Sequence, residues 1–164
     1  MIYEPLLQDL LTLRQGSLAD LDKIKELFTG TITTICTNDY TNEQIAVWAS
    51  TVENSHRWQD AVESQFFIIA EIDNEIVGFG SLDNNAYIDF MYVHKDYQRM
   101  GIAETLMNEL ETEARDCGTT ILKSDVSKTA KTFFEKKGFK VITEQINLRK
   151  GIEIVNYKMR KELL

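Results

Sequence analysis

The stretch IDFMYVHKDYQRMGIAETLMNEL, residues 88–110, contains the pattern that decides the fold. Residues 88–93 are typical of a β-strand, and from Ile102 onward apolar residues recur at helical spacing until Gly118. Between them lies the turn QRMGIA, residues 98–103. Its glycine lets backbone N–H groups approach a ligand closely, and the helix that follows directs its positive dipole end at the same point. This order of strand, turn and helix predicts a diphosphate-binding site.

The composition indicates one domain. The chain has 164 residues, a single proline and 43% hydrophobic content, which is enough for one domain with a substantial core over residues 1–164. No apolar run approaches membrane-spanning length, and residues 1–11 (MIYEPLLQDLL) carry acids where a signal peptide would carry Lys or Arg. These features predict a cytoplasmic protein with no membrane partner.

The charge balance limits the classes of partner. A net charge of −8 argues against a nucleic-acid partner, because binding to a phosphate backbone needs a concentrated basic face. An acidic surface is compatible with a cationic amine as substrate. The two cysteines, Cys36 and Cys117, lack the spacing of a metal or redox site and are interpreted as small hydrophobic residues of the interior. No metal is expected, because His94 has no second ligand to complete a site.

The order of patterns along the chain predicts a mixed α/β protein. Ser17 with Asp20 is typical of a helix cap, whereas the Thr-rich residues 29–38 argue against continuing that helix. Thr41 is expected to cap a second helix, and a third is expected around residues 58–62. The expected strands are residues 11–14, 66–72, 75–82, 87–93, 119–126, 139–147 and 152–161, with further helices at 102–117 and 129–137.

Several segments together resemble the GNAT superfamily of acetyl-CoA-dependent N-acetyltransferases. QRMGIA resembles the coenzyme-binding turn of its motif A, residues 74–82 (NEIVGFGSL) resemble its second hairpin, and residues 130–139 (AKTFFEKKGF) resemble its A-x-x-F-[YF]-E-x-x-G-F segment. Residues 38–50 (NDYTNEQIAVWAS) and 127–134 (SKTAKTFF) are similar to a bacterial, YafP-like branch of the family. In family order, the resemblance covers nearly the whole chain.

This resemblance implies a fold and an activity. The implied fold class is α/β: a GNAT-type mixed, mostly antiparallel β-sheet flanked by helices, with a splayed parallel strand pair at the cofactor site. The implied activity is transfer of the acetyl group of acetyl-CoA to a primary amine of a small molecule or peptide by direct attack. A non-catalytic acyl-CoA-binding module is the alternative. A toxin-type transferase acting on charged transfer RNA is a weaker third, because the chain lacks a basic face. A homodimer is left open.

The resemblance also assigns cofactor-binding residues. Backbone groups of Met91, Tyr92 and Val93 are expected to pair with the pantetheine arm, in the manner of strand addition. The phosphates are expected at the N–H groups of the turn and at the Arg99 side chain. The complete expected set is Met91, Tyr92, Val93, Gln98, Arg99, Met100, Gly101, Ile102, Ala103, Ser127 and Phe134.

Asp89 is the expected catalytic residue. It is a carboxylate inside an otherwise apolar strand, and a charge in such a position should face a cleft or a structural cation. The two-residue period of a strand places Tyr87, Asp89 and Met91 on one face. Two roles are open: Asp89 takes the ammonium proton of the acceptor, directly or through water, or it anchors the ammonium by pairing with it.

Phe134 departs from the family pattern. Many GNAT proteins place a tyrosine general acid at this position, and phenylalanine cannot donate a proton. Ser127 stands where the family often has an asparagine that contacts the cofactor arm. Tyr87, Tyr92, Tyr157 or water remain as proton donors, and a poor donor is tolerable because a thiolate leaves readily near neutral pH.

The helical segment before the sheet contains Trp48 and the triplet His56, Arg57 and Trp58. By resemblance, this segment shapes the acceptor pocket. From the residues themselves, Trp48 is interpreted as a core anchor of its helix, and the triplet as a solvated face with one packed aromatic ring.

Overall fold

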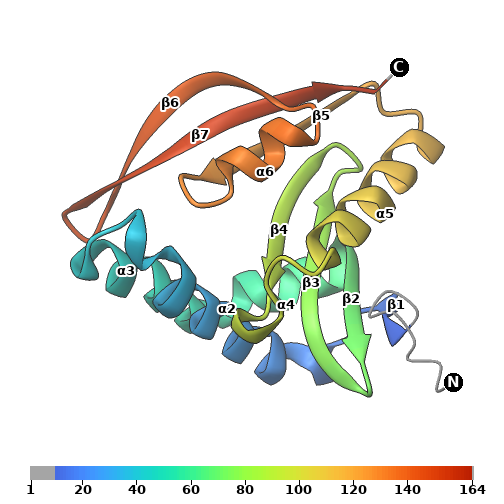
Figure 1. Ribbon diagram of the computed structural model, residues 1–164, viewed down its shortest axis with the longest axis horizontal. Helices are drawn as coiled ribbons and strands as arrows, with labels where there is room; N and C mark the ends of the chain where they lie inside the picture. The colour runs from blue at the N-terminus through green and yellow to red at the C-terminus, as the bar shows by residue number, and fades with distance from the viewer. Residues whose placement is uncertain (1–9, 164) are drawn as a thin grey trace, which may run out of the picture.

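The computed structural model describes residues 10–163, so most of the N-terminal segment tested above for a signal peptide lies outside the described residues. Figure 1 shows a seven-stranded sheet in the order β1-β2-β3-β4-β5-β7-β6. All neighbouring strands are antiparallel except β4 and β5, which are parallel. This confirms the expected mixed sheet. The strands are β1 Thr12–Gln15, β2 Phe66–Ile72, β3 Glu75–Asp83, β4 Tyr87–Val93, β5 Ile121–Ser127, β6 Lys140–Arg149 and β7 Ile152–Glu162.

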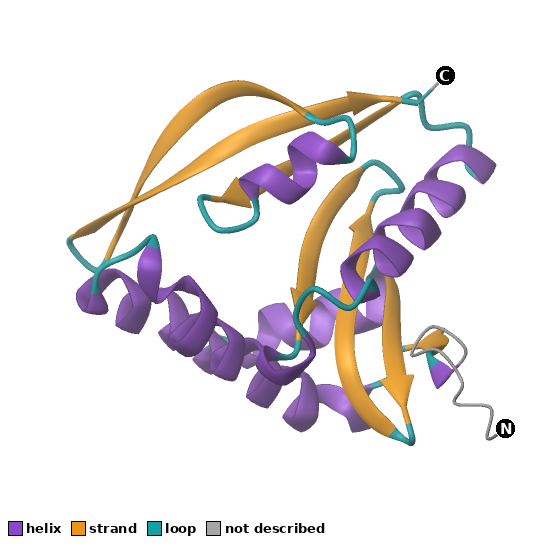
Figure 2. Ribbon diagram, viewed as in Figure 1, coloured by secondary structure: helices purple, strands orange, loops and turns teal. Residues whose placement is uncertain are grey.

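Helices flank the sheet (Figure 2). The α-helices are α2 Leu21–Ile35, α3 Asn42–Ala49, α4 Ser55–Ser64, α5 Ile102–Asp116 and α6 Lys131–Lys136. Short 3-10 turns are η1 Leu18–Asp20, η2 Cys36–Asn38, η3 Ser50–Glu53 and η4 Lys95–Tyr97. Within residues 10–163, no helix combines the length and the apolar character that a membrane crossing requires.

Two apolar clusters fill the space between the sheet and its helices. The stripe of α5, including Ile102 and Leu106, packs with Phe134 of α6 in one cluster, and residues of α2, α3 and α4 form the other. Glycine in β3 permits the close approach of α5, because a Cβ at Gly78 would lie 3.0 Å from Ile102 Cγ2 and 3.1 Å from Leu106 Cδ1. The periodicity that predicted α5 is therefore the pattern of its buried face.

The structure corrects the prediction for residues 29–38. Helix α2 continues to Ile35 and passes into η2, although threonine is a poor helix former. Tertiary contacts explain the difference. Ile32 is fully buried, and the hydroxyl of Thr31 donates a 2.8 Å hydrogen bond to the carbonyl of Val93 in β4. Burial of this face outweighs the weak local preference.

A β-bulge in β4 corrects the predicted face of Asp89. Leu82 pairs with Ile88 but Ser81 pairs with Phe90, so Asp89 is the extra residue on its strand. The two-residue alternation stops there. Met91 packs against the cluster of α5, whereas Asp89 is directed to α4, so these two side chains do not share a face.

The parallel strands β4 and β5 separate almost as soon as they meet. Their register contains only Tyr87 with Lys123 and Ile88 with Ser124. Beyond Ile88, β4 continues for five residues without a partner in β5. One edge of β4 thus presents backbone groups to the space between the strands, which is the splayed arrangement that the resemblance implied.

Candidate functional site

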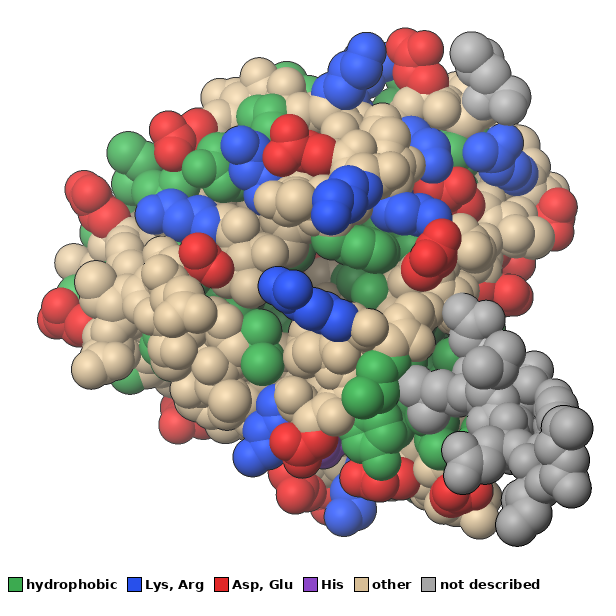
Figure 3. All heavy atoms as spheres, viewed as in Figure 1, with side chains coloured by type: hydrophobic (Ala, Val, Ile, Leu, Met, Phe, Trp, Pro, Cys, Tyr) green, Lys and Arg blue, Asp and Glu red, His purple; other side chains and the backbone are tan. Residues whose placement is uncertain are grey.

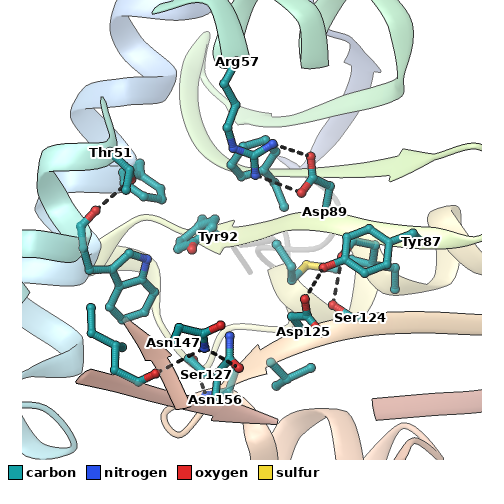
Figure 4. A pocket seen from close by; sticks show the side chains of 18 of the residues that line it. Thr51, Arg57, Tyr87, Asp89, Tyr92, Ser124, Asp125, Ser127, Asn147 and Asn156 are labelled. Atoms are coloured by element: carbon teal, nitrogen blue, oxygen red, sulfur yellow. Dashed lines mark hydrogen bonds and ion pairs between the residues drawn. The ribbon is translucent and has the colours of Figure 1, made fainter. Parts of the chain in front are cut away.

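A cavity of about 330 Å³ opens where β4 and β5 separate. Its walls come from β4 to β7 and from helices on both faces of the sheet (Figure 4). Five of the predicted site residues line it: Met91, Tyr92, Ser127, Phe134 and Asp89. The predicted turn, residues 98–103, lies outside this cavity at the other end of β4.

Asp89 is held by three hydrogen bonds. Its Oδ1 accepts a 2.9 Å bond from Arg57, and its Oδ2 accepts a 3.1 Å bond from Arg57 and a 2.7 Å bond from Gln65. The carboxylate is 11% exposed and its charge is compensated by the guanidinium. These bonds use three of its roughly four acceptor positions, which leaves one on Oδ1.

Arg57 reaches Asp89 from α4, as Figure 4 shows. Its guanidinium carbon lies 4.7 Å from the ring centre of Phe90, which stacks in turn on the buried Trp58. The hydrogen bonds that Arg57 donates to the Asp89 carboxylate raise the pKa of Arg57, so it stays charged. The expectation of one packed aromatic in this triplet is confirmed for Trp58, but the pairing of Arg57 with Asp89 was missed. Trp48 lines the cavity and packs edge-on to Tyr40 at 5.4 Å.

A second polar group lies on the β5 to β7 wall. The hydroxyl of Tyr87 donates a 3.0 Å hydrogen bond to Oδ2 of Asp125, and Nε2 of Gln145 donates one of 3.0 Å to Oδ1 of Asp125. Gln145 and Asn147 both donate to Oδ1 of Asn156, at 3.1 and 3.0 Å. Apart from Tyr87, no member of this network was marked by the sequence, because its members come from four strands that only the sheet order brings together.

The three candidate tyrosine donors differ in position. Tyr87 and Tyr92 line the cavity, but Tyr157 does not. Burial raises the pKa of Tyr92, and burial together with the charge of Asp125 raises that of Tyr87. Each hydroxyl is therefore a weaker acid than that of a free tyrosine. Tyr157 instead packs with the α5 cluster, and Lys131 Nζ lies 4.8 Å from its ring centre.

Phe134 and Ser127 lie on the α6 side of the cavity. Phe134 is buried and packs edge-on against Phe139 at 5.0 Å between ring centres. The hydroxyl of Ser127 accepts a 3.1 Å hydrogen bond from the backbone N–H of Ala130, which leaves its own proton available to a ligand.

The turn before α5 has the geometry of an anion-binding site. Gly101 is the N-cap residue of α5 in the left-handed conformation, with φ 84°, and Arg99 also has positive φ, 60°. No described residue accepts a hydrogen bond from the backbone N–H of Gly101, Ile102 or Ala103. The Arg99 side chain is exposed and has no ion pair with the described residues. A row of free donors at a helix N-terminus attracts anionic groups.

The side chains of Gln98 and Ile102 in this turn serve the fold. Gln98 donates to the carbonyls of Val93 and His94 at 2.7 and 3.3 Å, and Ile102 is buried under β3. Met100 is exposed. Only backbone groups are therefore available to a ligand at Gln98 and Ile102.

The surface view supports an anionic ligand at this end. Figure 3 shows a hollow between α6 and the segment leading into α5, with apolar side chains at its base and Lys and Arg side chains on two sides. Among residues 10–163, no cluster of three or more His, Cys, Asp or Glu side chains is arranged to hold a metal ion.

Comparison with known proteins gives consistent relatives. The family model of the acetyltransferase (GNAT) domain matches residues 36–161. The uncharacterised N-acetyltransferase YafP of Escherichia coli (strain K12) is 30% identical over 141 residues, which cover 86% of this chain and 89% of YafP. A crystal structure of a GCN5-related N-acetyltransferase from Rhodopseudomonas palustris has a TM-score of 0.89 at 31% identity, covering 93% and 95% of the two chains. PaiA N-acetyltransferase from Thermoplasma acidophilum, crystallised with coenzyme A, has the same fold, with a TM-score of 0.78 at 20% identity over 93% and 99%.

Proposed function

Because the chain belongs to the GNAT acetyltransferase family, as its motifs predicted, we propose that it transfers the acetyl group of acetyl-CoA to a primary amine of a small molecule or peptide by direct attack. The observation that carries this proposal is the separation of β4 from β5 beyond Ile88. It leaves a strand edge free to pair with an extended ligand, and the free N–H groups of the α5 N-terminus lie at the far end of that strand.

The residues present fit coenzyme A at both ends of β4. At the turn, the left-handed Gly101 and the free N–H groups provide donors for a diphosphate, and Arg99 provides a positive charge. Along β4, Met91 and Tyr92 line the cavity. The carbonyl of Val93 already accepts hydrogen bonds from Thr31 and Gln98. We therefore assign backbone pairing with the pantetheine arm to Met91 and Tyr92 in preference to Val93.

When bound, acetyl-CoA supplies an activated thioester. The chain must then deliver a neutral amine to its carbonyl. Asp89 has one acceptor position left, on Oδ1, and from it can take a proton from the amine directly or through a water molecule. Arg57 fixes the orientation of Asp89 at the β-bulge.

The departing thiolate has two tyrosine hydroxyls within the same cavity, those of Tyr87 and Tyr92. Both are protonated at neutral pH, as tyrosines ordinarily are, and their place in the cavity distinguishes them from Tyr157. Phe134 closes the α6 side without donating. We therefore favour Tyr92 and Tyr87 over Tyr157 as donors, with water as the remaining choice; Tyr87 can serve only when its proton is released from the hydrogen bond to Asp125.

A non-catalytic acyl-CoA-binding module is the second candidate. The observation that favours it is Phe134, which occupies the position of the tyrosine general acid in the family pattern. Binding of acetyl-CoA without transfer would be the behaviour of such a module.

Release of thiol from acetyl-CoA across a panel of primary amines tests the proposal, with calorimetric titration of acetyl-CoA beside it. We expect micromolar-range cofactor binding and amine-dependent thiol release. Binding with no release on any amine would favour the module, and failure to bind acetyl-CoA would refute both candidates.

A further inference from the structure

We infer that Asp125 binds the ammonium group of the acceptor, and that the acceptor is a primary amine with an aromatic or apolar body and no carboxylate beside the amine. This rests on the proposed function and extends it to the class of acceptor. Two carboxylates line the cavity, Asp89 and Asp125, and their surroundings differ in charge.

Asp89 is already neutralised by Arg57, with which it shares two hydrogen bonds. Asp125 receives hydrogen bonds only from neutral groups, Tyr87 and Gln145, and has no ion pair with any residue that the structure describes. Each of its oxygens accepts one hydrogen bond and so keeps one acceptor position. Asp125 is exposed to solvent, and a cavity carboxylate with no ion pair and with free acceptor positions is suited to an ammonium group.

Asp125 also has the right place along the strands. It directly follows Ser124, the last residue of β5 that pairs with β4, so it lies where the strands separate. Figure 4 shows Asp125 on one side of Tyr87 and Asp89 on the other. An amine bound by Asp125 therefore lies in the same cavity as the carboxylate that we propose to take its proton.

The opposite wall of the cavity is aromatic. It favours a flat or apolar body next to the amine, because such a surface offers stacking and apolar contact. The aromatic lining residues are Phe28, Tyr40, Trp48, Trp58, Phe90 and Tyr92.

The cations near Asp125 are not placed to bind the carboxylate of an amino-acid substrate. Arg57 is engaged by Asp89, and Lys158, opposite Asp125 on β7, neither lines the cavity nor pairs with Asp125. Arg149 lines the cavity, but its partner on β7 is Ile152, whereas the β7 partner of Asp125 is Lys158. These two partners are six residues apart, which is about 20 Å at the rise of a strand. A carboxylate on the carbon next to the amine would meet two acids, and the one cavity-lining cation beside them in the described residues, Arg57, is already engaged.

The test uses three matched probes: phenethylamine, phenylalanine amide and phenylalanine, which differ only at the carbon beside the amine. Each is titrated calorimetrically into protein saturated with coenzyme A. We expect phenethylamine and phenylalanine amide to bind at least about tenfold more tightly than phenylalanine, on the scale of one hydrogen bond between charged groups. Thiol release from acetyl-CoA with the same probes should follow the same order in KM.

Asp125→Asn keeps the shape of the side chain and removes its charge. We expect it to weaken phenethylamine binding at least about tenfold and to leave coenzyme A affinity unchanged. Asp116→Asn, the same change at the exposed end of α5 outside the cavity, should alter neither. A thermal melt of each variant confirms that it is folded.

The outcomes separate the two proposals. If the wild-type protein binds coenzyme A but shows no preference for phenethylamine over phenylalanine, or binds neither, the inference about Asp125 is wrong and the proposed function stands. Unchanged phenethylamine affinity in Asp125→Asn would also show that the inference about Asp125 is wrong, and the proposed function would stand. If the wild-type protein fails to bind coenzyme A, the proposed function itself is refuted.

Discussion

Substitution of Gly101 by Glu should weaken acetyl-CoA binding strongly and lower the stability of the protein only slightly. This residue caps α5 with φ 84°, a conformation that costs a residue with a side chain about 1 kcal/mol. That strain should lower the melting temperature by about 2–4 °C in a domain of this size. In Gly101→Glu, the new carboxylate also enters the space in front of the free N–H groups of the helix.

The electrostatic cost to cofactor binding is larger than this backbone strain. A carboxylate about 5 Å from one phosphate charge costs about 3 kcal/mol at an effective dielectric constant of about 20. We therefore expect Gly101→Glu to reduce acetyl-CoA affinity by at least about 100-fold, and Gly101→Ala to reduce it much less. Calorimetric titration of acetyl-CoA measures both.

Gly118 provides the matched control. It has φ 81°, follows the other end of α5, and nothing lies within 4 Å of a Cβ built on it. Gly118→Glu should carry a similar backbone strain and retain wild-type affinity for acetyl-CoA. If folded Gly101→Glu binds acetyl-CoA within about threefold of Gly118→Glu, the assignment of the diphosphate to this turn is refuted.

Three further outcomes are expected. Asp89→Asn should lower kcat about 100-fold, the usual scale for a lost acid or base, with acetyl-CoA affinity retained; near-wild-type kcat at saturating amine would remove Asp89 from the reaction. Phe134→Tyr should leave kcat within about tenfold if another group protonates the thiolate, whereas a gain of several orders of magnitude would identify a module that has lost its acid. Hydrogen bonds from Arg14 lower the pKa of Asp20, so its stabilisation is present above the unfolded-state pKa and is lost as the pH falls through the folded-state value. Thermal melts of Asp20→Asn should therefore depend less on pH below about pH 4 than those of the wild type, and parallel curves would contradict this.

Local patterns in the sequence were sufficient for most of the sheet. Asp73 and Asn74 lie between the two predicted strands 66–72 and 75–82, and both have positive φ, at 51° and 64°, which these residue types tolerate. Thr41 caps α3 as expected and accepts from the N–H of Gln44. Residues 29–38 were misjudged because the contacts that hold them in a helix come from β4, sixty residues away in sequence.

The candidate site was only partly accessible to the same reasoning. The turn before α5 is a contiguous motif, so its glycine and its place before a helix could be found from sequence. Asp89 was singled out because a charge in an apolar strand is unusual, but its bulge and its partner Arg57 depend on strand register and helix packing. Asp125 had no signal, since an acid in an exposed position of a strand is ordinary until the fold places it in a cavity.

The narrow connection between β4 and β5 also has a consequence for cooperativity. Two residue pairs join the β1 to β4 half of the sheet to the β5 to β7 half, while long antiparallel ladders hold each half together. Regions with so few shared hydrogen bonds can open separately, below the free energy of global unfolding. We expect native-state amide exchange to show two levels of protection, one for each half, in the free protein. A ligand that hydrogen-bonds between the strands should bring the two levels together, so that the sheet opens as one unit.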